Sequence, residues 1–250
     1  MSGVALCVPI LDDREGIADV LPRVTRALAG VSHTVCVVDD GSRDGTLEWL
    51  LAWEAEHPNC HVIRRQKQRP GCLRGAATRD GLRWLLAHTR HEVFIDLDAD
   101  GSQRPEEIPG ALAHLAGHPD CDVVVASKYA RGSRVTGRPW LRRAGSRVYN
   151  GVLRAGLGSS LRDYSNSYRF YRRGAAELVA SADTRHESPV FLVEMMAIWL
   201  AAGLQIDELA THYDEREGGR SKVGWRDALR GFVGAWEVIR DAHRGRYRIG

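Results

Sequence analysis

Hydrophobic and polar positions follow two alternating patterns along the first hundred residues. Short apolar or β-branched runs predict strands, and longer stretches with apolar residues three and four positions apart predict helices. The expected strands are Val4–Pro9, Thr34–Val38, Val62–Arg64 and Val93–Leu97, and the expected helices are Ile17–Leu28, Asp44–Glu56 and Ala76–His88. This order predicts an α/β fold whose parallel sheet is flanked by helices and binds ligands at the carboxyl ends of its strands.

The same pattern continues beyond residue 100 and then becomes basic. A helix over Glu106–Ala116 and a strand over Val123–Ala126 are expected, and the run RRAGSRVYNGVLRAGLG at 142–158 predicts another helix. Between Trp225 and Ala242, apolar residues recur at helical spacing beside several arginines. Such a basic amphipathic helix packs on its own domain by default, and contact with a membrane surface is the alternative.

Composition is that of an ordinary globular protein, with 44% hydrophobic and 27% charged residues among 250. The apolar start MSGVALCVPI lacks a basic region, so no secretory signal is expected. The longest near-apolar stretch, Met195–Leu204, is too short to span a bilayer. Five cysteines without CxxC spacing predict reduced, buried thiols rather than a zinc site. We therefore expect a cytoplasmic protein, with peripheral contact at the inner face of the membrane left open.

Charge is distributed very unevenly. Residues 128–173 hold twelve Lys and Arg and a single acid, Asp163, which gives +11 in a chain of net charge +3 and leaves −8 for the remainder. A solvated helix face usually mixes signs, so this segment favours an anionic partner. A nucleic-acid-binding module is disfavoured because aromatic residues are few there and no RNA- or DNA-binding signature occurs.

Acidic clusters follow two of the expected strands: Asp39-Asp40, and Asp96, Asp98 and Asp100. Alternate strand residues share a face, so Asp98 and Asp100 can converge on one hard cation while Gly101 lets the backbone turn. Oxygen ligands of this kind suit Mg²⁺ or Mn²⁺. The structural alternative is a pair of aspartates that cap a turn.

The segment DADGS also approximates the DxDG(T/S) signature of haloacid-dehalogenase-type phosphatases. That chemistry requires an acidic pair further along the chain to complete its magnesium site. No Asp-Asp pair and no GDxxxD follows residue 101, so we reject this hypothesis.

Several motifs together resemble one family. VVDDGSRDGT at 37–46, DADGSQRPEE at 98–107 and REGGRSK at 216–222 have the order and spacing of family 2 glycosyltransferases, and the sequence resembles their dolichol- or polyprenyl-phosphate mannose synthase branch. Further segments that resemble this branch are VPILDDREGI (8–17), RPGCLRGAATRDGL (69–82), DYSNSYRFYRR (163–173) and FLVEMM (191–196). The resemblance extends from about Val8 to Trp236.

The chain departs from the pattern of that branch at five positions. Asp12 replaces the usual Asn, Cys72 a frequent Lys, and Lys128 the usual Arg. Asn166 replaces a small Thr or Ser, and Asp96 stands where an apolar residue is normal. We interpret Asp96 as a core-facing or supporting residue rather than a metal ligand.

The resemblance implies a GT-A fold: a single nucleotide-binding domain with a central, mostly parallel sheet flanked by helices. We expect this domain over 1–222, with nucleotide-sugar binding mainly in 1–127 and acceptor binding mainly in 128–222, followed by the basic helix and tail at 223–250. The residues implied for the nucleotide sugar are Pro9, Asp12, Glu15, Asp39, Asp40, Ser42, Gly71 and Asp98. For Asp39-Asp40, an Asx turn with a downstream helix cap is an alternative that can hold at the same time.

The resemblance also implies a reaction: metal-dependent, inverting transfer of a hexose from a GDP-mannose-like or UDP-sugar donor to a polyprenyl phosphate. Asp98 and Asp100 would hold Mg²⁺ or Mn²⁺, with Ser102 or Gln103 adding an oxygen ligand. An acceptor phosphate is already anionic and needs a cationic cradle rather than a base. The residues implied for that cradle are Lys128, Arg142, Arg143, Arg216, Ser221 and Lys222.

A hydroxyl acceptor on a soluble natural product or glycan is the alternative, and it would require a catalytic base. Asp163 and Glu194 are the candidates for that base. Asp163 can equally be a structural ion-pair partner, because it is the sole acid in the basic segment. Arg169 is expected to organise the site through ion pairs rather than to touch substrate.

Overall fold

The computed structural model describes residues 3–66, 73–137, 139–215 and 225–248, with side chains of the last segment described from residue 229. A seven-stranded sheet forms its centre, in the order β3-β2-β1-β4-β7-β5-β8. The strands are β1 (Val4–Ile10), β2 (His33–Asp39), β3 (Cys60–Arg64), β4 (Val93–Asp96), β5 (Val123–Ser127), β7 (Arg169–Arg172) and β8 (Ile206–Ala210). All pair in parallel except β7, which lies antiparallel between β4 and β5.

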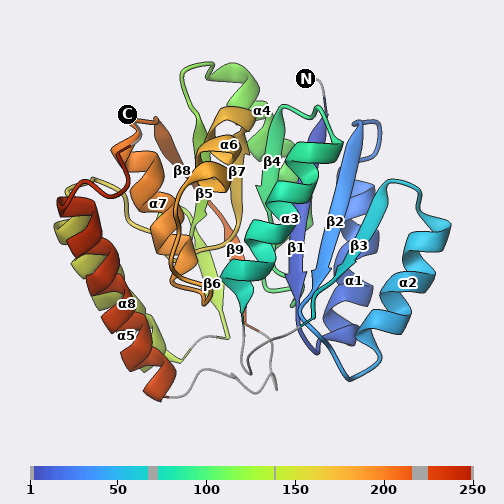
Figure 1. Cartoon of the computed structure of the whole chain (residues 1–250), viewed down its shortest axis with the longest axis horizontal. Helices are drawn as coiled ribbons and strands as arrows, with labels where there is room; N and C mark the ends of the chain where they lie inside the picture. Colours follow the sequence, from blue (N-terminus) through green and yellow to red (C-terminus); the bar gives the residue numbers. More distant parts are fainter. Residues whose placement is uncertain (1–2, 67–72, 138, 216–224, 249–250) are drawn as a thin grey trace.

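Helices cover both faces of this sheet (Figure 1). They are α1 (Arg14–Ala27), α2 (Thr46–Glu56), α3 (Arg74–His88), α4 (Ile108–Gly117), α5 (Trp140–Leu157), α6 (Arg173–Ser181), α7 (Phe191–Ala201) and α8 (Trp225–His243), with a 3₁₀ turn η1 (Pro105–Glu107) before α4. One buried cluster joins the sheet to α1, α2 and α4, and the other joins it to α3, α5, α6, α7 and α8. The fold therefore has three layers with an apolar core on each side of the sheet.

A small second sheet lies beside the main one. It pairs β6 (Arg134–Thr136) in parallel with β9 (His212–Asp214). The backbone N–H of Asp214 donates to the carbonyl of Ser102 at 3.0 Å, which ties β9 to the loop after β4. This small sheet is therefore linked to the aspartate loop.

The predicted strands and helices of the first 126 residues are all present, within a few residues of their expected bounds. The helices expected at 142–158 and 225–242 are also present. Sequence patterns did not predict the antiparallel strand β7, nor α6, α7, β6, β8 and β9. The expected division into 1–222 and 223–250 stays a prediction, although α8 packs on α5 and α7.

Two further expectations concern membranes and thiols. Among the described residues, none of the helices combines the length and the apolarity needed to cross a bilayer. Cys7, Cys36, Cys60 and Cys121 are free thiols and all are buried, as predicted. Cys72 lies outside the described residues.

Candidate active site

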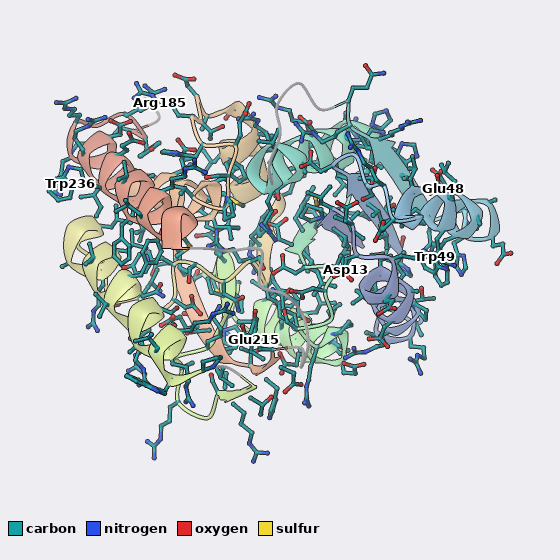
Figure 2. All side chains as sticks on the ribbon, turned by 90° about the horizontal axis from the view of Figure 1, so that it is seen from below. Asp13, Glu48, Trp49, Arg185, Glu215 and Trp236 are labelled. Atoms are coloured by element: carbon teal, nitrogen blue, oxygen red, sulfur yellow. The ribbon has the colours of Figure 1, made fainter. Side chains whose placement is uncertain are left out.

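The carboxyl ends of β1, β2 and β4 meet at one edge of the sheet, the lower edge in Figure 1. The parallel register places Ile10 beside Asp39 and Cys7 beside Asp96. Because the three strands end together, the loops that follow them bring the expected acidic residues into one region. Figure 2 looks onto this edge, with Asp13 near its middle and Trp49 farther out on α2.

Asp12 links the loops after β1 and β2. Its N–H donates to the Ser42 hydroxyl at 2.9 Å, and its Oδ1 accepts from the Arg43 N–H at 2.7 Å. Asp12 has a positive φ of 50°, a region that Asn and Asp tolerate better than other side-chain-bearing residues. Asp12 can therefore adopt the backbone conformation that the usual Asn would adopt at this position.

Asp39 and Asp40 are buried and have different partners. Asp39 accepts from the N–H groups of Gly41 and Ser42 at 3.2 to 3.3 Å, which is the expected Asx turn. Asp40 pairs with Arg65 and accepts from the Leu73 N–H at 3.1 Å. The turn and a buried ion pair thus fix the geometry of the expected nucleoside loop.

An open pocket of about 590 Å³ lies between α1 and α2. It brings together two of the expected nucleoside residues, Asp12 and Glu15. The complete lining is Asp12, Asp13, Arg14, Glu15, Ala18, Asp44 and Trp49. Pro9, Asp39 and Asp40 are buried and do not line it.

Asp98 is held by three side chains. Arg74 donates to its Oδ1 from Nε at 3.0 Å and from Nη2 at 2.5 Å. On Oδ2, Ser167 Oγ donates at 2.5 Å and Gln103 Nε2 at 2.9 Å. Burial alone would raise the pKa of Asp98, but the Arg74 charge and the Ser167 hydrogen bond outweigh it and lower that pKa. Asp98 is therefore a carboxylate.

Asp100 has the opposite electrostatic environment. Its burial, and then the neighbouring charge of Asp98, raise the pKa of Asp100, while its Oδ1 accepts from the Ser102 N–H at 2.9 Å. Asp98 and Asp100 are two neighbouring carboxylates, and only Asp98 is paired with an arginine. A hard divalent cation bound by both carboxylates would neutralise their mutual repulsion. The two aspartates therefore fit Mg²⁺ or Mn²⁺, which their carboxylates would hold.

The two expected auxiliary ligands differ. Gln103 is buried, and its Oε1 accepts from the Asp98 N–H at 2.9 Å while its Nε2 donates to Asp98 and Ser167. That amide positions Asp98 rather than offering oxygen to a cation. Ser102 Oγ is buried and, within the described part of the chain, has no hydrogen-bond partner. Of the two, Ser102 better fits an added oxygen ligand.

Asp96 lies behind the site, fully buried in the core as expected. Tyr171 donates to its Oδ1 at 3.1 Å. Burial raises the pKa of Asp96 to about 6, against the opposing charges of Arg74 and Arg169. Asp96 therefore belongs to the support of the site and is not accessible as a ligand.

The basic segment supplies Lys128, which is almost completely buried beside Asp163. Its Nζ lies 3.6 Å from Asp163 Oδ2 and 5.1 Å from the centroid of the Tyr213 ring. Asp163 is fully buried and accepts from the N–H groups of Lys128 and Asn166, both at 3.0 Å. Asp163 thus has the structural ion-pair role that the sequence left open.

Glu194 is also fully buried, on α7. It accepts from the N–H groups of Arg185 and His186 at 2.9 and 3.1 Å and from the Tyr247 hydroxyl at 3.2 Å. These contacts attach the loop before α7 and the end of the chain to that helix. The carboxylates of Glu194 and Asp163 therefore both hold backbone segments in place.

Arg169 organises the site in a different way from the one expected. Its guanidinium donates to three backbone carbonyls, those of Tyr164, Asn166 and Leu192, each at 2.8 Å. It also lies over the Trp199 ring at 5.6 Å. Hydrogen bonds to carbonyls, rather than direct ion pairs, therefore fix the loop that carries Ser167.

Of the other residues expected to bind the acceptor phosphate, the structure describes only Arg142 and Arg143. Arg142 is exposed and pairs with Glu215 at 2.7 Å. Arg143 lines a small cavity together with Lys128, Tyr129, Val135 and Arg147. Arg216, Ser221 and Lys222, and Gly71 on the nucleotide side, lie outside the described residues.

Two residues of the site were missed by the sequence interpretation. Arg74 lies in the RPGCLRGAATRDGL segment and Ser167 in the DYSNSYRFYRR segment, and both bind Asp98. Their place in those family-like segments was the available signal. Sequence spacing could not reveal that they meet one carboxylate, because 24 and 69 positions separate them from it.

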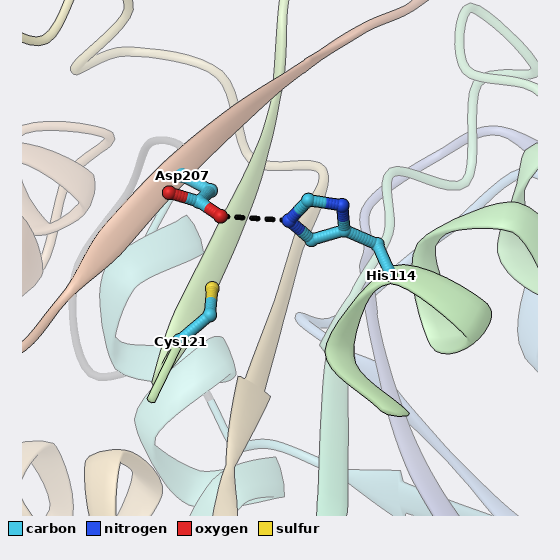
Figure 3. A group of neighbouring side chains, drawn as sticks. All are labelled: His114, Cys121 and Asp207. Carbon is cyan, nitrogen blue, oxygen red and sulfur yellow. Dashed lines mark hydrogen bonds and ion pairs between the residues drawn. The ribbon is translucent and has the colours of Figure 1, made fainter. Parts of the chain in front are cut away.

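A second group of polar side chains lies at the amino ends of β5 and β8, opposite the aspartate edge (Figure 3). His114, Cys121 and Asp207 place one donor atom each within 4.8 Å of one another. His114 Nε2 and Asp207 Oδ2 are in direct contact at 2.7 Å, and Cys121 Sγ donates to the Val123 carbonyl at 3.3 Å. These hydrogen bonds account for the grouping.

Comparison with known proteins identifies relatives of this chain. The family model described as Glycosyl transferase family 2 matches residues 6–179. An undecaprenyl-phosphate mannosyltransferase of Micrococcus luteus is 30% identical over 88% of the chain and 87% of its own length. A polyprenol monophosphomannose synthase of Mycolicibacterium smegmatis is 32% identical over 86% of the chain and 79% of its own length.

Solved structures show the same fold at lower identity. Glucosyl-3-phosphoglycerate synthase of Mycobacterium tuberculosis in complex with Mg²⁺ and uridine diphosphate superposes with a TM-score of 0.66. It is 17% identical, over 95% of this chain and 79% of that one. A second structure of that enzyme contains Mn²⁺, uridine diphosphate and glucosyl-3-phosphoglycerate, with a TM-score of 0.64 over 98% and 80% of the two chains.

Proposed function

The chain belongs to glycosyl transferase family 2, and from this membership we propose that it transfers a hexose from a nucleoside-diphosphate sugar to a polyprenyl phosphate. The similarity to two lipid-phosphate mannosyltransferases over most of the chain carries this proposal. The GT-A fold and the Asp98 and Asp100 pair at the carboxyl ends of the strands support the donor half of the reaction.

On the donor side, Asp98 and Asp100 would hold the cation, and Ser102 would supply a further oxygen ligand. A bound Mg²⁺ or Mn²⁺ would stabilise the negative charge that develops on the departing nucleoside diphosphate. Gln103 and Ser167 orient Asp98, and the charge of Arg74 keeps that carboxylate ionised. Asp12, Glu15, Asp39, Asp40 and Ser42 shape the nucleoside region.

On the acceptor side, two carboxylates that could have served a hydroxyl acceptor are unavailable. Asp163 and Glu194 are fully buried, and each accepts hydrogen bonds from backbone N–H groups. A general base must reach the proton that it abstracts. A phosphate acceptor needs no base, which supports polyprenyl phosphate over an alcohol. Lys128 and Arg143 contribute positive charge at one small cavity.

With this function, we propose that the protein works in the cytoplasm, in peripheral contact with the membrane that holds the lipid acceptor. A polyprenyl chain is too apolar to leave a bilayer on its own, so the enzyme must approach the lipid surface. The positive charge of the 128–173 segment favours such an approach to anionic headgroups.

A transfer assay with labelled donor sugars tests the proposal. Polyprenyl phosphate and the corresponding polyprenol are compared as acceptors, with GDP-mannose and UDP-glucose as donors and Mg²⁺, Mn²⁺ or chelator present. We expect transfer to the phosphate alone and loss of transfer with chelator. Equal use of the polyprenol would replace this proposal with the hydroxyl-acceptor alternative. Asp98→Asn should lose transfer to the phosphate. Glu106→Gln, which alters a carboxylate that pairs with Arg23 at the surface, is the matched control and should retain it.

A further inference from the structure

Large hydrophobic side chains are exposed on one side of the molecule. Among the described residues, Trp140, Leu141 and Trp236 are 77, 67 and 65% exposed. The complete group consists of Trp140, Leu141, Val148 and Val152 on α5 and Leu229, Phe232, Val233 and Trp236 on α8. We call this group the α5–α8 face. Contiguous exposed apolar residues of this kind indicate an interaction surface rather than ordinary solvent-facing sequence.

The two helices lie side by side and run in the same direction. Tyr149 of α5 contacts Phe232 of α8, with ring centroids 5.2 Å apart, and seven residues later Gly156 meets Ile239. A Cβ on Gly156 would lie 2.4 Å from the Ile239 side chain, so glycine permits the close approach. The second contact lies seven residues after the first on α5 and also seven residues after the first on α8, so the two helices are parallel.

The opposite sides of these helices fill the core. Leu153 of α5 and Ala235, Val238 and Ile239 of α8 belong to the buried cluster on that side of the sheet. The exposed group is therefore separate from the side that holds the helices in place. Trp236 points outward, away from the sheet, in Figure 2.

The charge around this face has one sign on α5. That helix carries four exposed arginines and no acidic residue: Arg142, Arg143, Arg147 and Arg154. On α8, Arg230 and Arg240 are exposed, Glu237 is partly exposed and Asp241 is buried. Tryptophan and leucine beside arginines are typical of helices that lie in the interface of an anionic bilayer.

We propose that the α5–α8 face docks on an anionic lipid bilayer, with its apolar side chains in the headgroup region and its arginines on lipid phosphates. The inference rests on the proposed function, because a polyprenyl phosphate acceptor lies in such a bilayer. Both helices begin at the edge of the sheet that carries Asp98 (Figure 1), so docking places the bilayer beside the acceptor side of the site.

A second copy of the chain fits this face less well. Arg142 pairs with Glu215. A symmetric pairing would bring the other three arginines of one α5 toward those of the second copy, without acidic partners from that helix. Anionic headgroups neutralise the same charges. Charge complementarity therefore favours the lipid surface.

Vesicle co-sedimentation tests the docking, using phosphatidylglycerol-containing and pure phosphatidylcholine vesicles at low salt. We expect binding to the anionic vesicles. Trp140→Ser with Trp236→Ser should weaken that binding by at least about tenfold. Arg147→Gln with Arg154→Gln should weaken it in a salt-dependent manner. Leu51→Ser, on the exposed side of α2, is the control and should bind as the unaltered protein.

Several outcomes overturn the inference: no binding to anionic vesicles, full binding by the double-Trp variant, or a dimer in analytical ultracentrifugation that the Trp substitutions dissociate. Circular dichroism melting curves verify that each variant folds.

Transfer to a short-chain, water-soluble prenyl phosphate separates the docking from the proposed function. The double-Trp variant should retain that activity and lose transfer to vesicle-borne acceptor. If the protein binds vesicles but transfers to neither acceptor, the proposed function fails while the docking stands.

Discussion

Two regions of the molecule differ in the partners of their side chains: the Asp98 cluster, formed by Asp98, Arg74, Ser167 and Gln103, and the α5–α8 face. Around Asp98, both carboxylate oxygens accept hydrogen bonds from side chains of three different segments. On the α5–α8 face, large apolar side chains are exposed to solvent. The contacts within the chain hold the first region in place, whereas the exposed side chains of the second leave a surface on which a partner can bind. Under the two proposals above, donor binding depends on a site that the fold holds in place, and access to the acceptor depends on contact with the lipid surface.

The largest expected effect tests the Asp98 cluster directly. Asp98→Ala should lower metal-dependent kcat/KM on the order of 10³-fold, because it removes a cation ligand and leaves the Arg74 charge in its place. Steady-state kinetics and calorimetric titration of Mn²⁺ measure the two consequences separately. Near-normal activity of Asp98→Ala in the presence of chelator would show that the reaction does not require the metal.

Arg169→Met tests how much the three hydrogen bonds from the guanidinium to backbone carbonyls stabilise the loop that carries Ser167. Leaving three buried carbonyls without their donor should reduce the free energy of unfolding by about 3–5 kcal/mol. Urea unfolding gives the value. Arg131→Met, at an exposed position, is the control and should change it by less than about 0.5 kcal/mol. Equal effects of the two substitutions would show that the buried guanidinium does not hold the loop.

The buried carboxyl of Asp96 should make stability depend on pH. Its pKa is raised from 3.8 to about 6, so the folded state binds the proton more tightly than the unfolded chain. This contribution is complete below about pH 4 and is lost as the pH rises through 6, up to about 3 kcal/mol in total. Compared with Asp96→Asn, the unaltered protein should therefore lose stability between pH 4 and 7 in urea melts. A constant difference across that range would contradict the assignment.

The smallest expected effect concerns the α5–α8 face. Trp140→Ser with Trp236→Ser should change the free energy of unfolding in the absence of lipid by less than about 0.5 kcal/mol per site, because both side chains are already exposed. Thermal melts without vesicles measure it. A large destabilisation would mean that these residues pack within the fold, and the contrast between the two regions would disappear.

Local patterns predicted much of the fold. The strands before Asp39 and Asp98 and the helices between them follow from apolar spacing alone, and the aspartates at the strand ends indicated the cation site. Strand β7 was missed, because its antiparallel place between β4 and β5 depends on pairing between segments far apart in sequence. The same distance hid Arg74 and Ser167 as partners of Asp98.

Residue types and periodicity by themselves determined the α/β class, the acidic edge of the sheet, the helix α5 and the amphipathic character of α8. Only the tertiary structure decided which candidate acids are reachable: it buried Asp96, Asp163 and Glu194 and left Asp98 partly exposed. It also decided which apolar sides of α5 and α8 fill the core and which remain open. A sequence records the chemistry and spacing of each side chain, whereas burial and pairing depend on the segments that folding brings against it.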